Sequence, residues 1–192
     1  MSILILGLVL FLGTHSVGML ASAWRDRTAA RLGEIPWKGL YSAVSLAGFL
    51  LIVWGYDLAS HHPVGIYSPP VSLRHVTLLL MVPAFPLLLA AYLPGRIQSA
   101  VKHPMLAAVK LWAFAHLLAN GNLADVILFG SFLAWAVADR ISLKRRTPPP
   151  VRGAPPGKAN DIIAVVGGLA LYGAFVMVLH ARLFGVSPLG AH

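Results

Sequence analysis

Residues 2–21 read SILILGLVLFLGTHSVGMLA, an apolar run that contains no Lys, Arg, Asp or Glu. A helix of about 20 apolar residues is long enough to cross the hydrocarbon core of a bilayer. The run therefore predicts a transmembrane helix. Five further apolar runs follow along the chain, at residues 39–59, 73–93, 104–119, 123–141 and 162–183.

The composition of the chain fits a membrane protein. Of its 192 residues 58% are hydrophobic and only 11% are charged, whereas a soluble domain carries about 25% charged residues. No run alternates polar and apolar residues at every second position, as the strands of a membrane β-barrel do. Helices satisfy every backbone hydrogen bond inside lipid. We therefore expect an all-α, polytopic membrane bundle of six transmembrane helices that forms a single domain over residues 1–192.

The basic residues predict the orientation of these helices. The net charge is +9, and twelve of the fifteen Lys and Arg residues fall in the first, third and fifth loops. Loops rich in Lys and Arg stay on the cytoplasmic side of a membrane. Both termini are therefore expected outside the cytoplasm. We attribute the positive charge to this orientation and to contact with anionic lipid, and we expect no nucleic-acid partner.

The loops are marked by turn-forming and charged residues. We expect a polar loop at 25–38, a loop rich in Pro, Gly and His at 61–70, and a tight turn at Asn120-Gly121-Asn122. The proline-rich segment 144–158 is expected to be extended and flexible. Small residues four apart, Ala43/Ala47 and Ala164/Gly168, suit close helix packing.

A cleaved signal peptide is the alternative interpretation of the first run. Ala21-Ser22-Ala23 has the small-x-small form of a cleavage site. The run before it has no basic residue, however, and it is long and contains a histidine. We therefore expect it to remain as a transmembrane helix.

Histidine is the main candidate metal ligand in this chain. There is no cysteine, which excludes disulfides, thiolate-held clusters and covalently attached haem, but there are eight histidines. Ionisable residues at membrane depth are functional candidates by default. They are His15, Lys110, His116 and Asp125, with His75 and His180 nearer the outer ends of their helices.

His15 continues a helical stripe that begins with Gly7 and Phe11 and ends with Gly18 and Met19. Glycines on such a stripe let a partner helix or a flat cofactor approach closely. The same pattern suits a buried histidine bonded to a neighbouring helix, and the sequence favours neither interpretation.

The segment 103–122 presents two separate faces if it is helical. His103 and His116 differ by 220° in helical phase and lie about 20 Å apart along the axis, so they cannot bind one metal from a straight helix. Trp112 lies one turn before His116, and this aromatic face could line the edge of a haem. It equally suits an ordinary helix–helix interface. The face comprises Met105, Val109, Trp112, His116 and Asn120, whereas His103 shares its face with Lys110.

The same segment carries a family resemblance. His103-Pro104-Met105, Leu111-Trp112-Ala113 and the run AHLLANG at 115–121 together resemble the signature of the NnrU family. His15-Ser16, Leu32-Gly33-Glu34 with Tyr41-Ser42, and the closing segment 180–188 also fit that family. The resemblance covers essentially the whole chain. Asn122 is a departure, since the family has Asp there.

This resemblance implies a bacterial cytoplasmic (inner) membrane protein, with periplasmic termini, that is associated with denitrification and nitric oxide metabolism. The family is similar to the 15-cis-zeta-carotene isomerases, membrane enzymes that isomerise a carotenoid double bond with a histidine-held haem b. On this resemblance haem b is the expected cofactor. The ligand positions match His15 and His116, and His103 matches a further family histidine.

The membrane depths of these two histidines differ in the predicted topology. His15 lies about 20 Å from the outer end of its span, whereas His116 lies only about 6 Å from the outer end of the fourth span. Two ligands of one iron need similar depths, so helix tilt or a sunken fourth span would be required. Otherwise His75 or His180 is the nearer partner for His116.

Three functions compete at this point. The first is a haem-dependent redox protein or isomerase with a hydrophobic polyene substrate. The second is a non-enzymatic membrane factor for assembly or maturation of a reductase complex. The third is a transporter using Lys110, Asp125 and Asp57, which ranks last because no inverted repeat is visible. A reductase or electron-transfer protein is the expected partner besides membrane lipid.

Overall fold

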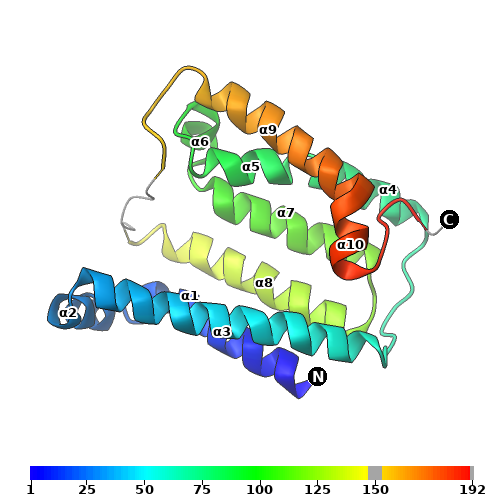
Figure 1. The fold of residues 1–192 in the computed structure, drawn as a ribbon, viewed down its shortest axis with the longest axis horizontal. Coiled ribbons are helices and arrows are strands. Elements are labelled where there is room, and N and C mark those ends of the chain that lie inside the picture. The colour runs from blue at the N-terminus through cyan, green and yellow to red at the C-terminus, as the bar shows by residue number, and fades with distance from the viewer. Residues whose placement is uncertain (147–152, 191–192) are drawn as a thin grey trace. The chain divides into compact units, whose positions relative to one another are not determined.

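The computed structural model describes residues 1–146 and 153–190 (Figure 1). The described residues form helices and one isolated antiparallel bridge, with no extended strand among them. They pack as two compact units that alternate along the chain. Unit 1 comprises Met1–Ser68 and Gly121–Pro148, and unit 2 comprises Pro69–Asn120 and Pro149–His192. Residues 147–152 of the proline-rich stretch expected to be flexible, six of its fifteen residues, lie outside the described residues.

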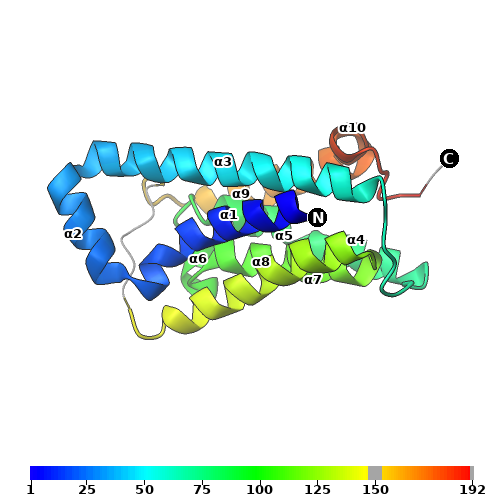
Figure 2. The same ribbon diagram turned by 90° about the horizontal axis from the view of Figure 1, so that it is seen from below.

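Unit 1 is built on three long helices. They are α1 (Ser2–Leu20), α3 (Glu34–Ser60) and α8 (Leu123–Ser142). The helix α1 packs along α3 and also contacts α8 (Figure 2). The short helix α2 (Ser22–Leu32) joins the end of α1 to the start of α3.

The expectation of a polar loop at 25–38 is wrong. These residues belong to α2 and the first turn of α3, and only Gly33, with a φ of 89°, interrupts the helices. Ala, Arg and Leu are good helix formers, so the charged composition does not prevent a helix here. The rings of Trp24 and Trp37 meet edge to face at 5.9 Å and hold α2 against α3.

Glycines bring the backbones of α1 and α3 into direct contact. A Cβ atom on Gly55 would lie 2.3 Å from the backbone nitrogen of Leu4, and one on Gly7 would lie 2.6 Å from that of Ile52. A Cβ atom on Gly48 would lie 2.7 Å from the backbone nitrogen of Phe11. No larger residue fits at these positions unless the helices separate. Of the two uses that the sequence leaves open for the glycines of this stripe, Gly7 shows close approach to a partner helix.

Unit 2 is built around α7 and α9. The helix α5 packs on both, and α4 packs on α7. Of the predicted small pair on α9, Ala164 is fully buried, and a Cβ atom on Gly168 would lie 2.4 Å from the nitrogen of Pro86 on α5. The elements are α4 (Ser72–Met81), α5 (Ala84–Ala90), α6 (Arg96–Val101), α7 (Pro104–Ala119), α9 (Asn160–Ala174), the π-helical turn η1 (Phe175–Leu179) and α10 (His180–Phe184).

Two of the predicted spans are interrupted within unit 2. The span expected at 73–93 is broken between α4 and α5, because Pro83 has no N–H and its ring clashes with the preceding turn. The backbone N–H of Val82 accordingly bonds to the carbonyl of Leu79 in a tighter turn. The span expected at 162–183 contains the π turn η1, which leads directly into His180.

The six predicted ranges all fall on helices, but their capacity to span a membrane differs. Four helical segments are long and apolar enough to cross a bilayer, namely Ser2–Leu20, Glu34–Ser60, Ser72–Ala90 and Asn160–Phe184. The helix α7 has only 16 residues, and α8 carries Asp125, Asp139 and Arg140. The all-α membrane bundle is confirmed, and the count of six spans stays a prediction.

The basic side chains of unit 1 gather at one end. All eight Lys and Arg residues described in this unit lie on α2, at the start of α3, or at the end of α8. The opposite end of the unit carries none of them. The orientation of this end toward the cytoplasm stays a prediction.

We expect Gly55→Ala to destabilise the protein by about 1–3 kcal/mol, because an added methyl group must push α1 away from α3. The measurement is the thermal unfolding midpoint in mild detergent. Gly39→Ala is the matched control, since it lies in the same helix and a Cβ atom there meets nothing within 4 Å. Equal midpoints for the two variants would contradict the close contact.

Candidate functional site

His15 lies in an aromatic cluster formed by all three long helices of unit 1. Its half-buried ring stacks on Phe11 of α1, with the ring centroids 4.3 Å apart. The ring centroids of Tyr41 on α3 and Trp135 on α8 lie 5.5 Å and 6.1 Å from that of His15, both in edge-to-face arrangements. The cluster therefore fixes the position of the imidazole from three sides.

The hydrogen bond of His15 determines which ring nitrogen carries the proton. Its Nδ1 lies 2.7 Å from the carbonyl oxygen of Phe11, one turn earlier. Because a carbonyl can only accept, Nδ1–H must donate, and the lone pair of a neutral ring is then on Nε2. Histidines that bind metals usually donate their other N–H to a carbonyl or a carboxylate in this way.

Two buried polar atoms in the same unit lack a partner. The indole Nε1 of Trp135 and the hydroxyl of Ser45 have no hydrogen bond among the described residues. Ser45 lies one helical turn after Tyr41 on α3. Buried donors are nearly always satisfied, so each such atom needs an explanation. The ring of Trp135 packs against His15, so its indole N–H suits a ligand or water molecule that offers an acceptor beside this histidine.

His116 repeats the arrangement of His15 in unit 2. Its Nδ1–H donates to the carbonyl of Trp112, one turn earlier, at 2.8 Å. The ring of Trp112 lies 5.5 Å from that of His116. The predicted aromatic–histidine face of α7 is therefore present in the structure.

His180 is the neighbour of His116 within unit 2. Their rings are 6.4 Å apart between centroids and inclined by only 21°. The Nδ1–H of His180 donates to the carbonyl of Val186 at 2.7 Å. Two imidazoles that share one metal, with bonds of about 2 Å, have centroids roughly 6 Å apart. Of the two alternative partners for His116, His180 contacts it, whereas His75 is exposed.

His103, the remaining predicted histidine, lies at the opposite end of α7 from His116. His103 is the residue before α7, whereas His116 lies in the last turn of that helix. The structure thus agrees that they do not share a metal. His15 and His116 belong to different units, and their joint ligation of one iron stays a prediction.

A haem needs few protein ligands. Among the described residues no three His, Asp or Glu side chains converge on one point. A porphyrin supplies four nitrogens of its own, so one or two histidines are enough to hold its iron. His15, with its fixed Nδ1–H, its aromatic neighbours and the unsatisfied Trp135 N–H, fits this requirement.

Asp125 has a structural role at the start of α8. Its side chain is only 3% exposed. The carboxylate accepts one hydrogen bond from the hydroxyl of Tyr56 and another from the backbone N–H of Asn122, at 3.1 Å. The Asn122 side chain in turn caps the helix, so the two residues form a capping box. This arrangement accounts for a carboxylate that the sequence marked as a functional candidate.

The turn at residues 120–122 holds the loop that follows α3. The backbone N–H groups of Ile66 and Tyr67 both donate to the carbonyl of Gly121. A Cβ atom on Gly121 would lie 1.9 Å from the carbonyl oxygen of Tyr67, so only glycine fits.

The side chain of Tyr67 has a raised pKa. Burial of the phenol is the larger cause, and the negative charge of Asp125 is the smaller one.

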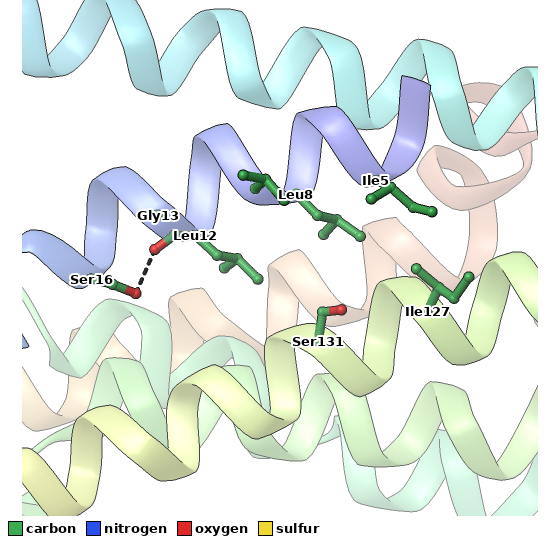
Figure 3. A pocket seen from close by; sticks show the side chains of 8 residues that line it. Ile5, Leu8, Leu12, Gly13, Ser16, Ile127 and Ser131 are labelled. Atoms are coloured by element: carbon green, nitrogen blue, oxygen red, sulfur yellow. Dashed lines mark hydrogen bonds between the residues drawn. The ribbon is translucent and has the colours of Figure 1, made fainter. Parts of the chain in front are cut away.

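A shallow apolar groove of about 370 Å³ runs between α1 and α8 (Figure 3). Ser16 lies at one end, where its hydroxyl is satisfied by the carbonyl of Leu12 at 2.6 Å. The groove is open to its surroundings. Its lining consists of Ile5, Leu8, Val9, Leu12, Gly13, Ser16, Ile127 and Ser131.

Comparison with known families tests the resemblance found in the sequence. The family described as NnrU protein matches residues 3–188. The chain belongs to the NnrU family. The match covers nearly the whole chain, so the resemblance carried by residues 103–121 is confirmed. No curated protein and no solved structure matches this NnrU chain, and its similarity to carotenoid isomerases stays a prediction.

We expect Tyr56→Phe to lower the free energy of unfolding by about 1–3 kcal/mol, because a buried oxygen of Asp125 loses its donor. Chemical or thermal unfolding in detergent measures this loss. Tyr92→Phe is the control, since Tyr92 is 48% exposed. A loss of the same size in both variants would contradict a specific Tyr56–Asp125 bond.

Proposed function

We propose that this NnrU-family protein is a membrane haem protein whose haem b iron is held by histidine imidazoles, with His15 of unit 1 and His116 of unit 2 as the candidate ligands. The observation that carries the proposal is the orientation shared by the two rings. Each donates Nδ1–H to the carbonyl of the residue four positions earlier, at 2.7 Å and 2.8 Å. Each therefore presents Nε2 as its metal-binding atom.

The surroundings of each ring support the same role. Phe11 and Trp135 shield one face and one edge of His15, and Trp112 lies beside His116. Apolar and aromatic neighbours exclude water from a cofactor and so influence its redox potential. The unpaired N–H of Trp135 offers a donor for a polar group of the cofactor. In this proposal the ring of Trp112 packs beside His116, the second candidate ligand.

Haem supplies one-electron chemistry when it is bound, and the protein supplies position and environment. We connect this chemistry with nitrogen-oxide metabolism, in which an electron-transfer partner or a reductase would meet the protein at the membrane. The apolar groove between α1 and α8 supports a second role for the same unit. A polyene or another long apolar substrate would fit its open shape.

The proposal is tested by visible spectra of the full chain, purified in mild detergent with haem supplied during expression. We expect a Soret band and sharp α and β bands after reduction with dithionite. His15→Ala and His116→Ala should each weaken or abolish these bands, because a residue that would hold the iron is lost. His61→Ala and His62→Ala are the matched controls, since both side chains are exposed.

The outcomes separate the alternatives. A protein that stays colourless with haem present contradicts the proposal and favours a non-enzymatic assembly or maturation factor. His180→Ala is included because His180 contacts His116. If it abolishes the bands whereas His15→Ala leaves them unchanged, the ligand pair is His116 and His180, and the role of His15 is contradicted.

A further inference from the structure

Two arginines of unit 1 converge on Gly18, near the end of α1. Arg25 comes from α2, and Arg146 comes from the turn after α8. A Cβ atom on Gly18 would lie 3.4 Å from Nη1 of Arg25 and 3.6 Å from Nη1 of Arg146. The absence of a side chain at Gly18 thus leaves room for both guanidinium groups at one point.

The other nitrogens of these two side chains are already engaged. Arg25 donates from Nε and Nη2 to the carboxylate of Asp26. Arg146 donates from Nε to the hydroxyl of Ser142 and from Nη2 to the carboxylate of Asp139. The Nη1 groups have no bond among the described residues and are the ones that meet over Gly18. Each guanidinium is therefore held in place with one donor group presented to the same space.

The burial and charge of the surroundings favour an anion at this point. The side chains of Arg25 and Arg146 are only 26% and 23% exposed, so their charges are partly shielded from water. The α2 end of unit 1 has eight basic residues against three acidic ones, Asp26, Glu34 and Asp139. Partly desolvated arginines with paired donors bind phosphate oxygens more strongly than exposed lysines do.

We propose that Arg25 and Arg146 form a binding site for one phosphate group, with Gly18 as its floor. A tetrahedral phosphate can accept from both Nη1 groups through separate oxygens, because both lie within 3.6 Å of one point. The same chemistry is present in the headgroup of an anionic phospholipid and in a free phosphate.

The position of the site favours the lipid as the source of the phosphate. It lies at the end of a membrane-length apolar helix, where headgroups are expected. Trp24 and Trp37 pack together on α2 and α3 at the same end of the unit. Tryptophans of this kind mark the headgroup level of membrane proteins. The haem proposal does not depend on this site, and this site does not depend on haem.

The test uses delipidated full-length protein in a neutral detergent. It is titrated with dioleoyl phosphatidylglycerol, and bound lipid is counted by native mass spectrometry. We expect one tightly bound lipid per chain, and Arg25→Gln/Arg146→Gln should raise its Kd about tenfold or more. Arg27→Gln/Arg145→Gln is the matched control, because it removes the same charge from two exposed neighbours. It should change the Kd by less than about threefold.

A second variant keeps every charge. Gly18→Leu fills the point where the two Nη1 groups meet and should weaken lipid binding as much as the double substitution. Gly39→Leu is its control, since nothing lies within 4 Å of a Cβ atom there. Equal losses in the two arginine pairs, or full affinity in Gly18→Leu, would overturn the proposal.

Competition with inorganic phosphate and glycerol phosphate separates the two sources. If millimolar concentrations of either displace the lipid only from the unaltered site, the site takes phosphate from solution. If they do not displace it, the headgroup is the occupant, and dioleoyl phosphatidylcholine should then bind more weakly than phosphatidylglycerol. Equal affinity for the two lipids, together with no effect of soluble phosphate, would contradict a phosphate-anion site.

Discussion

The backbone contact between α1 and α3 is the constraint on which unit 1 depends. Lipid is as apolar as the helix surface, so close van der Waals packing must supply much of the attraction between membrane helices. Three glycines allow that packing, namely Gly7, Gly48 and Gly55. Their contacts fix the axial position of α1 along α3. His15 therefore meets Tyr41 at a fixed level. The same contact positions the end of α1, where α2 turns back and brings Arg25 toward Gly18.

Much of the fold could be predicted from the sequence because hydrophobic length is a strong signal in a membrane protein. All six predicted ranges fall on helices, and the small pair Ala164/Gly168 packs as expected. The details that failed depend on tertiary contacts. Ala43 and Ala47 have the spacing of a packing motif, yet they are exposed, and glycines on another face of α3 make the contact. Spacing alone does not say which face of a helix has a partner. The polarity of segment 25–38 predicts a loop, but the helix propensity of its Ala, Arg and Leu residues prevails in the structure.

The candidate site was found in part. His15, Trp112 and His116 were identified as ionisable or aromatic residues at membrane depth, and the structure gives the two histidines the same internal hydrogen bond. The polar atoms of Trp135 and Ser45 were missed, since nothing in an apolar run shows that a donor will lack a partner. A signal is present along α8 and the turn after it, where a polar or aromatic residue recurs at helical spacing: Phe132, Trp135, Asp139, Ser142 and Arg146. The π turn before His180 has no comparable signal in the sequence, and such turns are frequent at functional sites.

We propose that histidine imidazoles of this NnrU-family protein hold a haem iron. Electron paramagnetic resonance on the oxidised full chain, labelled with ¹⁵N-histidine, tests it most directly, because the labelled nitrogens couple to the iron only when they are bound. If histidines hold the iron, we expect a low-spin ferric signal with hyperfine coupling from two histidine nitrogens. A ferric haem signal without histidine coupling, or no haem iron after haem has been supplied, would contradict it.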